Sequence, residues 1–233
     1  MIRKMYNYMK NTWNGEHRCL ALLASLVVLI ILIFATDGSM HFGKVVIALA
    51  TTTVFLGGIA AMSDTIKHAV IGIMLVLPPM IMEWLSTSLE WNNAHLLLVP
   101  NLYSLPFYIF LIYVVSSYVF HSGIVTQDRM LGAICIYLML GVMWTNAYRV
   151  VYQLNEGAFS FGLENSDSVV EPYRELLYFS YVTLTTLGYG ETTPISDHAR
   201  VLAIFEAITG ILFVGILIAR LSGALNANKN TEN

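Results

Sequence analysis

Residues 183–194 read Thr-Leu-Thr-Thr-Leu-Gly-Tyr-Gly-Glu-Thr-Thr-Pro, and this stretch decides how the chain folds. It follows an apolar and aromatic segment, Tyr173 to Thr185, that is too short to cross a membrane, and it precedes a long apolar stretch. A short helix that enters the membrane and returns through irregular backbone is stable only where protein or a water-filled cavity surrounds it. The sequence therefore predicts a re-entrant helix that begins at Pro172, because proline suits the first helical position.

The composition excludes an ordinary soluble domain. Of the 233 residues, 57% are hydrophobic and only 12% are charged, whereas about a quarter of the residues in soluble proteins are charged. The 12 basic and 15 acidic residues are too evenly balanced to favour nucleic acid as a partner. Cys19 and Cys135 lie far apart in apolar stretches and predict neither a disulfide framework nor a zinc site. We expect an integral membrane protein in contact with lipids, without a cofactor.

Six apolar stretches are long enough to cross about 30 Å of hydrocarbon as helices. They run from Arg18 to Thr36, Val45 to Met62, His68 to Leu85, Leu102 to Phe120, Met130 to Leu154 and His198 to Leu221. The fold class predicted is an all-α membrane protein with six transmembrane helices and a re-entrant helix. If the N-terminus is cytoplasmic, the 12 basic residues divide eight to four in favour of the cytoplasmic side. This division favours two cytoplasmic termini. We also expect a plasma (inner) membrane location.

The pattern T-x-x-T-x-G-Y-G, followed by an acid and a proline, is similar to the signature of the tetrameric potassium-channel family. The resemblance covers roughly Met130 to Leu225 and does not extend to the first four apolar stretches. It implies a homotetramer that conducts K⁺ passively. We divide the chain into a peripheral four-helix domain (1–127), a pore domain (128–225) and a short cytoplasmic tail (226–233).

The resemblance implies that backbone carbonyls replace the water around K⁺ ions in a selectivity filter. The corresponding residues here are Thr186, Leu187, Gly188, Tyr189 and Gly190, and the metal ligands expected are the carbonyls of Thr186, Leu187, Gly188 and Tyr189. Alternate residues of such a filter adopt left-handed dihedrals, which Gly188 and Gly190 reach without steric cost. One chain forms only one wall of the ring, so four copies are needed.

Two residues depart from the commonest form of the family signature. Leu187 stands where Val or Ile is more frequent, which leaves a less selective cation pore as an alternative. Glu191 stands where Asp is common, and it either forms an outer acidic ring that concentrates cations or braces the filter through hydrogen bonds.

Side chains of the re-entrant helix are expected to support the filter. We expect Tyr189 to contact an aromatic wall made by Tyr178, Phe179 and Tyr181. The helix is expected to end at Thr185 and to direct the partial negative charge of its C-terminus toward a central cavity, which favours a cation.

The last apolar stretch contains the candidate gate. Gly210 lies 20 positions after Gly190, where the resemblance places a hinge glycine, and Gly215 lies 25 positions after it. The alternative role of Gly210 is close helix packing. One helical face carries further candidates, and by resemblance it lines the cavity, where a ring of Ile218 would close the pore by dewetting. That face consists of Ile211, Val214, Ile218 and Ser222.

The first four spans are not expected to form a conventional voltage sensor, because Leu102 to Phe120 contains neither Arg nor Lys. They form either a scaffold or a module that senses a ligand or a lipid. Glu83 is a functional candidate because charge within a membrane is expensive. Glu206 is expected to bond a Tyr or Trp of the fifth span, for example Trp144, or to sense protons. His121 and Asp128 are expected in a solvated linker.

A non-conducting regulatory subunit remains an alternative to a channel. An enzyme is disfavoured, because the chain has no HExxH zinc motif, no GxSxG nucleophile elbow and no P-loop. We expect no soluble regulatory domain after Leu225. Gating is therefore expected to come from the membrane portion, the filter or a separate partner, and the sequence identifies no accessory subunit.

Overall fold

The computed structural model describes residues 18–36, 41–61, 66–88, 94–121, 126–162 and 172–231. Five of its helices are long and apolar enough to cross a membrane, and a sixth, shorter apolar helix covers Cys19–Ala35. The five candidate spans are Phe42–Ile59, Val70–Ser88, Pro100–Val119, Gln127–Leu154 and Asp197–Arg220. The chain is therefore an all-α membrane protein, as the sequence predicts.

The helix bounds lie close to the predicted spans. The peripheral helices are α2 (Arg18–Ala35), α3 (His41–Ala61), α4 (Ile66–Ser88) and α5 (Ala94–Val119). They are followed by α6 (Gln127–Leu154), α7 (Pro172–Leu184) and α8 (Asp197–Thr231). The largest differences are at the end of α8 and at the start of α5, which begins at Ala94 rather than Leu102 and contains Pro100 and Pro106. Helix α8 continues into the predicted tail, up to Thr231.

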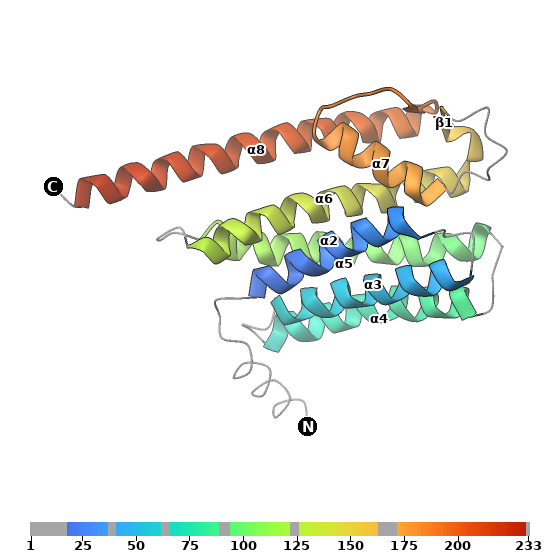
Figure 1. Cartoon of the computed structure of the whole chain (residues 1–233), viewed down its shortest axis with the longest axis horizontal. Helices are drawn as coiled ribbons and strands as arrows, with labels where there is room; N and C mark the ends of the chain where they lie inside the picture. The colour runs from blue at the N-terminus through green and yellow to red at the C-terminus, as the bar shows by residue number, and fades with distance from the viewer. Residues whose placement is uncertain are drawn as a thin grey trace.

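The helices lie side by side in layers (Figure 1). Helices α3 and α4 form one outer layer, α2, α5 and α6 lie in the middle, and α7 and α8 form the opposite layer. Helix α2 contacts both α3 and α6. It buries Leu22, Leu26, Leu29 and Ile33, whose spacing of three or four residues puts them on one face. This stripe joins the peripheral helices to α6 in one apolar core.

The prediction for Asp128 is wrong. Asp128 is buried in the first turn of α6, where it accepts hydrogen bonds from the Cys19 backbone amide (3.2 Å) and the Tyr118 hydroxyl (2.8 Å). A carboxylate at a helix N-terminus is favoured by the helix dipole. Asp128 therefore ties the starts of α2 and α6 to the end of α5. His121 is exposed, as expected, but its carbonyl accepts hydrogen bonds from Arg129 and Arg220.

A short sheet fixes the chain after the re-entrant helix. Strand β1 (Phe159–Phe161) follows the 3₁₀ helix η1 (Glu156–Ala158) and pairs antiparallel with β2 (Thr192–Pro194), with Phe159 opposite Pro194. The sequence analysis did not predict this pairing. It anchors the end of the Thr183–Pro194 stretch to the segment that follows α6.

Candidate functional site

The backbone between α7 and β2 alternates in handedness. Thr186, Gly188 and Gly190 have positive φ angles of 60°, 62° and 84°. The sequence predicts this for the two glycines, but it missed Thr186. A residue with a β-carbon is disfavoured in this region by about 1–2 kcal/mol. The period of two, counted back from Gly190 through Gly188, was the signal that would have found Thr186.

Lack of space does not explain why glycine occupies positions 188 and 190. A β-carbon at Gly188 or Gly190 would meet no atom within 4 Å in the single chain. The positive φ is therefore the reason for glycine at both positions.

The amides of this segment point back to the end of α7. The Thr186 amide donates to the Thr183 carbonyl (3.0 Å), and the Leu187 and Gly188 amides both donate to the Val182 carbonyl (2.9 and 3.3 Å). Where left-handed and right-handed dihedrals alternate, successive N–H groups gather on one side of the chain and the carbonyls turn to the other. This geometry would direct the carbonyls of this segment away from α7.

Residues 185–190 are exposed in the single chain, including the side chains of Leu187 (55%) and Tyr189 (65%). The aromatic wall expected around Tyr189 is not formed within the described part of one chain. The Tyr178 hydroxyl bonds Glu191 (2.8 Å), and the Tyr181 hydroxyl bonds the Leu138 carbonyl (2.8 Å). These hydroxyls find stronger or closer acceptors than another phenol.

Phe179 instead packs behind the segment, with its ring centroid 5.1 Å from that of Tyr148 and 5.7 Å from that of Phe159. The Tyr178–Glu191 bond agrees with the bracing role considered for Glu191. Thr185 lies just beyond the last residue of α7, Leu184, and its amide donates to the Tyr181 carbonyl (3.0 Å).

Buried polar contacts hold α7 against its neighbours. Glu206 of α8 is fully buried, and its carboxylate oxygens accept from the Tyr148 hydroxyl of α6 and lie 2.6 Å from Ser180 Oγ of α7. Ser180 Oγ is also 2.8 Å from the Gly141 carbonyl. One buried carboxylate thus joins three helices, and this arrangement satisfies a charge-bearing group within the membrane.

The expected bond between Glu206 and a Tyr or Trp of the fifth span is confirmed, but the partner is Tyr148 and not Trp144, the residue given as the example. Trp144 lies one helical turn before Tyr148 on the same face of α6, and the two rings are 6.3 Å apart. Trp144 Nε1 is buried and has no hydrogen-bond partner among the residues that the structure describes. The sequence identified the correct face of α6 but not the correct turn.

Gly210 allows α8 to cross α7 closely. A β-carbon at Gly210 would overlap the Leu184 carbonyl, the last residue of α7, and α8 is one continuous helix through this point. This contact supports the packing role considered for Gly210. A β-carbon at Gly215, by contrast, would meet nothing within 4 Å in the single chain.

Most of α8 is uncovered in the single chain, including the face predicted to line the cavity. Ile211, Val214 and Ile218 are 60%, 42% and 58% exposed, and they lie at the helical spacing that the sequence indicates. Ser222, on the same face, is also exposed.

The described residues contain no group of three or more His, Cys, Asp or Glu side chains that would hold a metal ion. Any ion bound at residues 185–190, which include no acidic side chain, would therefore meet backbone and hydroxyl oxygens. Helices around a re-entrant helix, followed by an alternating backbone segment and a long final helix, define a membrane protein with a pore loop.

Comparison with known proteins agrees with this class. Residues 136–226 match a family model described as "Ion channel". The chain is 32% identical to two-pore potassium channel 2 of Arabidopsis thaliana over 92 residues, which are 40% of this chain and 18% of the relative. It is 36% identical to the calcium-gated potassium channel TvoK of Thermoplasma volcanium over 58 residues, which are 25% of this chain and 17% of the relative.

These matches support a pore-loop potassium-channel family, and the residues that the family model matches run from α6 through α7 into α8. The chain spans less than a fifth of the length of each of these relatives. No solved structure matches this chain.

Proposed function

We propose that four copies of this chain form a pore that conducts K⁺ selectively and passively across a membrane. The observation that carries this proposal is the alternation of positive φ at Thr186, Gly188 and Gly190. It turns successive carbonyls to one side of the chain, where they replace the hydration shell of an alkali cation. The proposed K⁺ ligands are the carbonyls of Thr186, Leu187, Gly188 and Tyr189, with Gly190 at the outer end.

The exposure of the same segment supports the tetramer. Residues 185–190 are uncovered in one chain, and irregular backbone within a membrane is stable only where protein or a water-filled cavity surrounds it. The Ile211, Val214 and Ile218 face of α8 is uncovered as well. Closed rotational symmetry about an axis in front of this face would surround the filter with four identical walls. Tyr189 would then pack against a neighbouring copy rather than against its own α7.

We assign the gate to the part of α8 that follows Gly215. Ile218 lies on the exposed face, eight residues beyond the contact of Gly210 with α7, and a ring of four Ile218 side chains would close the pore by dewetting. Gly210 serves as a packing contact in this proposal. Gly215, which has no close neighbour in the single chain, is the position at which α8 has room to bend.

The proposal divides the chain into two domains with different roles. Residues 128–225 form the pore domain, and residues 1–127 form the peripheral domain. Both termini are cytoplasmic, and the membrane is the plasma (inner) membrane, because this orientation puts eight of the 12 basic residues on the cytoplasmic side. The described segment of α5 between Pro100 and Val119 carries no Lys or Arg, so conventional voltage sensing is not part of the proposal.

Flux into liposomes tests the proposal. Purified protein in potassium-loaded liposomes is expected to carry a barium-sensitive K⁺ flux, and reversal potentials in mixed Na⁺ and K⁺ are expected to follow the K⁺ gradient. Potentials that respond equally to both ions would favour the less selective cation pore. A folded tetramer without barium-sensitive flux would favour a non-conducting subunit and overturn the proposal.

A further inference from the structure

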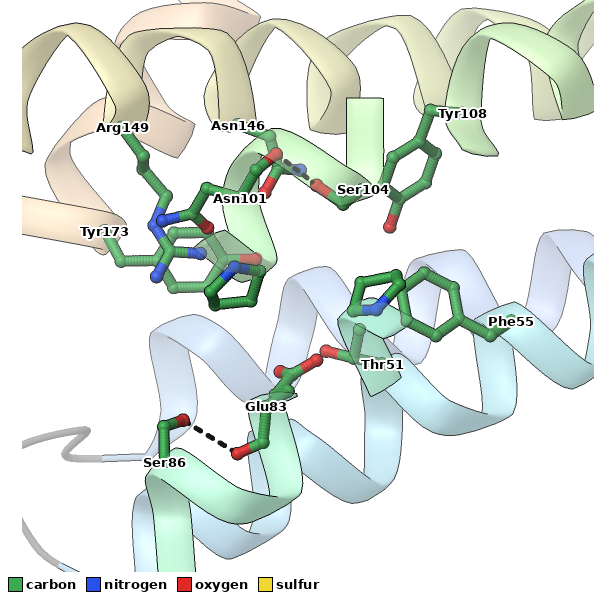
Figure 2. A pocket seen from close by; sticks show the side chains of 12 residues that line it. Thr51, Phe55, Glu83, Ser86, Asn101, Ser104, Tyr108, Asn146, Arg149 and Tyr173 are labelled. Carbon is green, nitrogen blue, oxygen red and sulfur yellow. Dashed lines mark hydrogen bonds between the residues drawn. The ribbon is translucent and has the colours of Figure 1, made fainter. Parts of the chain in front are cut away.

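A cavity lies where the peripheral helices meet the pore helices. Its volume is about 70 Å³, and residues from α3, α4, α5, α6 and α7 line it (Figure 2). A single water needs about 10–15 Å³ by this measure, so the cavity has room for about five non-hydrogen atoms. Its wall is unusually polar for an interior within a membrane protein, since it includes a carboxylate, a guanidinium, two asparagines and several hydroxyls.

Two opposite charges face this cavity. Glu83 enters from α4 beside Thr51 of α3, and Arg149 enters from α6 (Figure 2). Each lies five residues before the end of its helix, which is about 7.5 Å along the axis. Both charges therefore lie within the apolar helices but near the same end of the bundle.

Glu83 and Arg149 do not pair directly. Among the described residues, no ion pair within 4.0 Å joins them, and the only such pair links Arg200 and Asp197 on the surface. The Arg149 guanidinium carbon instead lies 4.3 Å from the centre of the Tyr173 ring. Separated charges in a half-buried site are costly unless polar groups lie between them. We therefore expect a polar molecule in the space between the two side chains.

The two charges together determine which kind of molecule the cavity would bind. A lone cation in the cavity would be repelled by Arg149, and a lone anion would be repelled by Glu83. A neutral molecule that carries both charges would satisfy both side chains at once. Neutral hydrogen-bonding groups complete the wall, because Tyr108 directs its hydroxyl into the cavity and Asn146, buried to 7% exposure, uses its amide nitrogen on the Val142 carbonyl. The Asn146 oxygen is left to accept a hydrogen bond.

We propose that this cavity binds a small zwitterion, with its primary ammonium on Glu83 and its anionic group on Arg149. Two sources share this chemistry. One is a free amino acid of the size of glycine, which has five non-hydrogen atoms. The other is the ethanolamine phosphate headgroup of a lipid that enters from the end of the bundle, and this larger group would lie only partly within the cavity.

Binding at Arg149 would reach the pore helix. Tyr173 is the second residue of α7, so an anion that draws the guanidinium away from its ring changes a contact at the start of that helix. A second peripheral contact meets the same turn, because Arg174 donates to the Thr36 carbonyl at the end of α2 (2.8 Å). This consequence for conduction rests on the proposed function, whereas the binding site itself does not.

Binding is tested on the purified full-length protein by its thermal unfolding midpoint. Glycine is compared with an equimolar mixture of methylammonium and acetate, which carries the same charges on separate molecules. Nanodiscs of phosphatidylethanolamine are compared with nanodiscs of phosphatidylcholine, whose trimethylated nitrogen has no N–H to donate. A higher midpoint with glycine alone identifies a free zwitterion, and a higher midpoint in phosphatidylethanolamine identifies a lipid headgroup.

The variants Glu83→Gln and Arg149→Gln are expected to lose the effect, with at least tenfold weaker binding. The exposed residues offer matched controls, Glu156→Gln and Arg200→Gln, which are expected to keep it. If neither zwitterion raises the midpoint of the wild-type protein, the cavity holds water only and the proposal is overturned. The same holds if the methylammonium and acetate mixture acts as well as glycine.

Native mass spectrometry of the wild-type protein gives a second readout that does not depend on the folding of any variant. Retention of phosphatidylethanolamine or glycine over the control molecules supports the site, and equal retention contradicts it. Because both readouts measure binding, they remain decisive even if the protein carries no K⁺ flux.

Discussion

Ser180 Oγ on α7 lies 2.6 Å from the Glu206 carboxylate on α8, and both residues are completely buried. The Tyr148 hydroxyl of α6 bonds the other oxygen of the same carboxylate. Through this contact, a movement of α8 near Glu206 would act on α7, the helix that precedes the alternating segment. A single buried carboxylate therefore links the proposed gate helix to the proposed filter.

Replacing Glu206 by Ala is expected to destabilise the fold by about 1–3 kcal/mol, because it leaves the Tyr148 hydroxyl without its acceptor, whereas Ser180 keeps the Gly141 carbonyl. Glu206→Gln keeps an acceptor oxygen and is expected to lose less. The measurement is the thermal unfolding midpoint in detergent, with Glu156→Ala as the exposed control. Equal midpoints for Glu206→Ala and wild type would show that the three-helix contact contributes nothing.

Gly188→Ala is expected to abolish K⁺ flux without preventing membrane insertion. The β-carbon has space in the single chain, so the harm comes from the φ of 62°, which costs an alanine about 1–2 kcal/mol and turns carbonyls away from the axis. Flux and insertion are measured in the same liposomes. Gly157→Ala, in the exposed η1 turn without a positive φ, is the matched control and should conduct normally. Unchanged flux in Gly188→Ala would contradict the proposed filter.

Gly210→Ala is expected to force α8 away from the end of α7, because its β-carbon would overlap the Leu184 carbonyl. Overpacking of this kind typically costs about 1–3 kcal/mol. The measurement is again the unfolding midpoint, compared with Gly223→Ala, where an added β-carbon meets nothing within 4 Å. If both variants unfold at the wild-type temperature, Gly210 is not a packing contact, and the hinge role regains support.

Tyr178→Phe and Glu191→Gln separate the two roles of Glu191. If Glu191 braces the filter through the 2.8 Å bond from Tyr178, both variants are expected to lose conduction faster during a sustained recording. If Glu191 acts as an outer ring of charge, only Glu191→Gln lowers the conductance, and the loss is largest at low salt. We expect the first result. Tyr113→Phe, at an exposed tyrosine of α5, serves as the control.

Opening is expected to depend only weakly on voltage. Each elementary charge moved through the full field contributes about 2.3 kcal/mol per 100 mV, and the apolar part of α5 from Pro100 to Val119 carries none. A conductance–voltage curve measures this dependence. A steep curve would mean that charged residues elsewhere in the peripheral helices move through the field.

Local chemistry made much of this fold readable in the sequence. Lipid offers the backbone no hydrogen bonds, so every long apolar run had to be a helix. The predicted ends differ from the observed ones by a few residues, except at the start of α5 and the end of α8. The positions of Gly188 and Gly190 likewise followed from a rule about single residues, since only glycine takes positive φ without a steric cost. The start of α7 at Pro172 follows from the same kind of rule.

Contacts between helices depend on how far each helix is rotated and displaced, and a span pattern does not fix either quantity. For this reason the sequence did not predict that Glu206 accepts a hydrogen bond from Tyr148 rather than Trp144. Nor did it predict that Asp128 is buried and accepts hydrogen bonds from Cys19 and Tyr118 instead of lying in a linker. The same reason explains why the cavity between Glu83 and Arg149 exists only in the folded chain. The sequence by itself determined which segments are helices and where the backbone reverses its handedness, because those properties belong to neighbouring residues. Only the tertiary structure decided which buried polar groups meet, because that outcome depends on the packing of five helices at once.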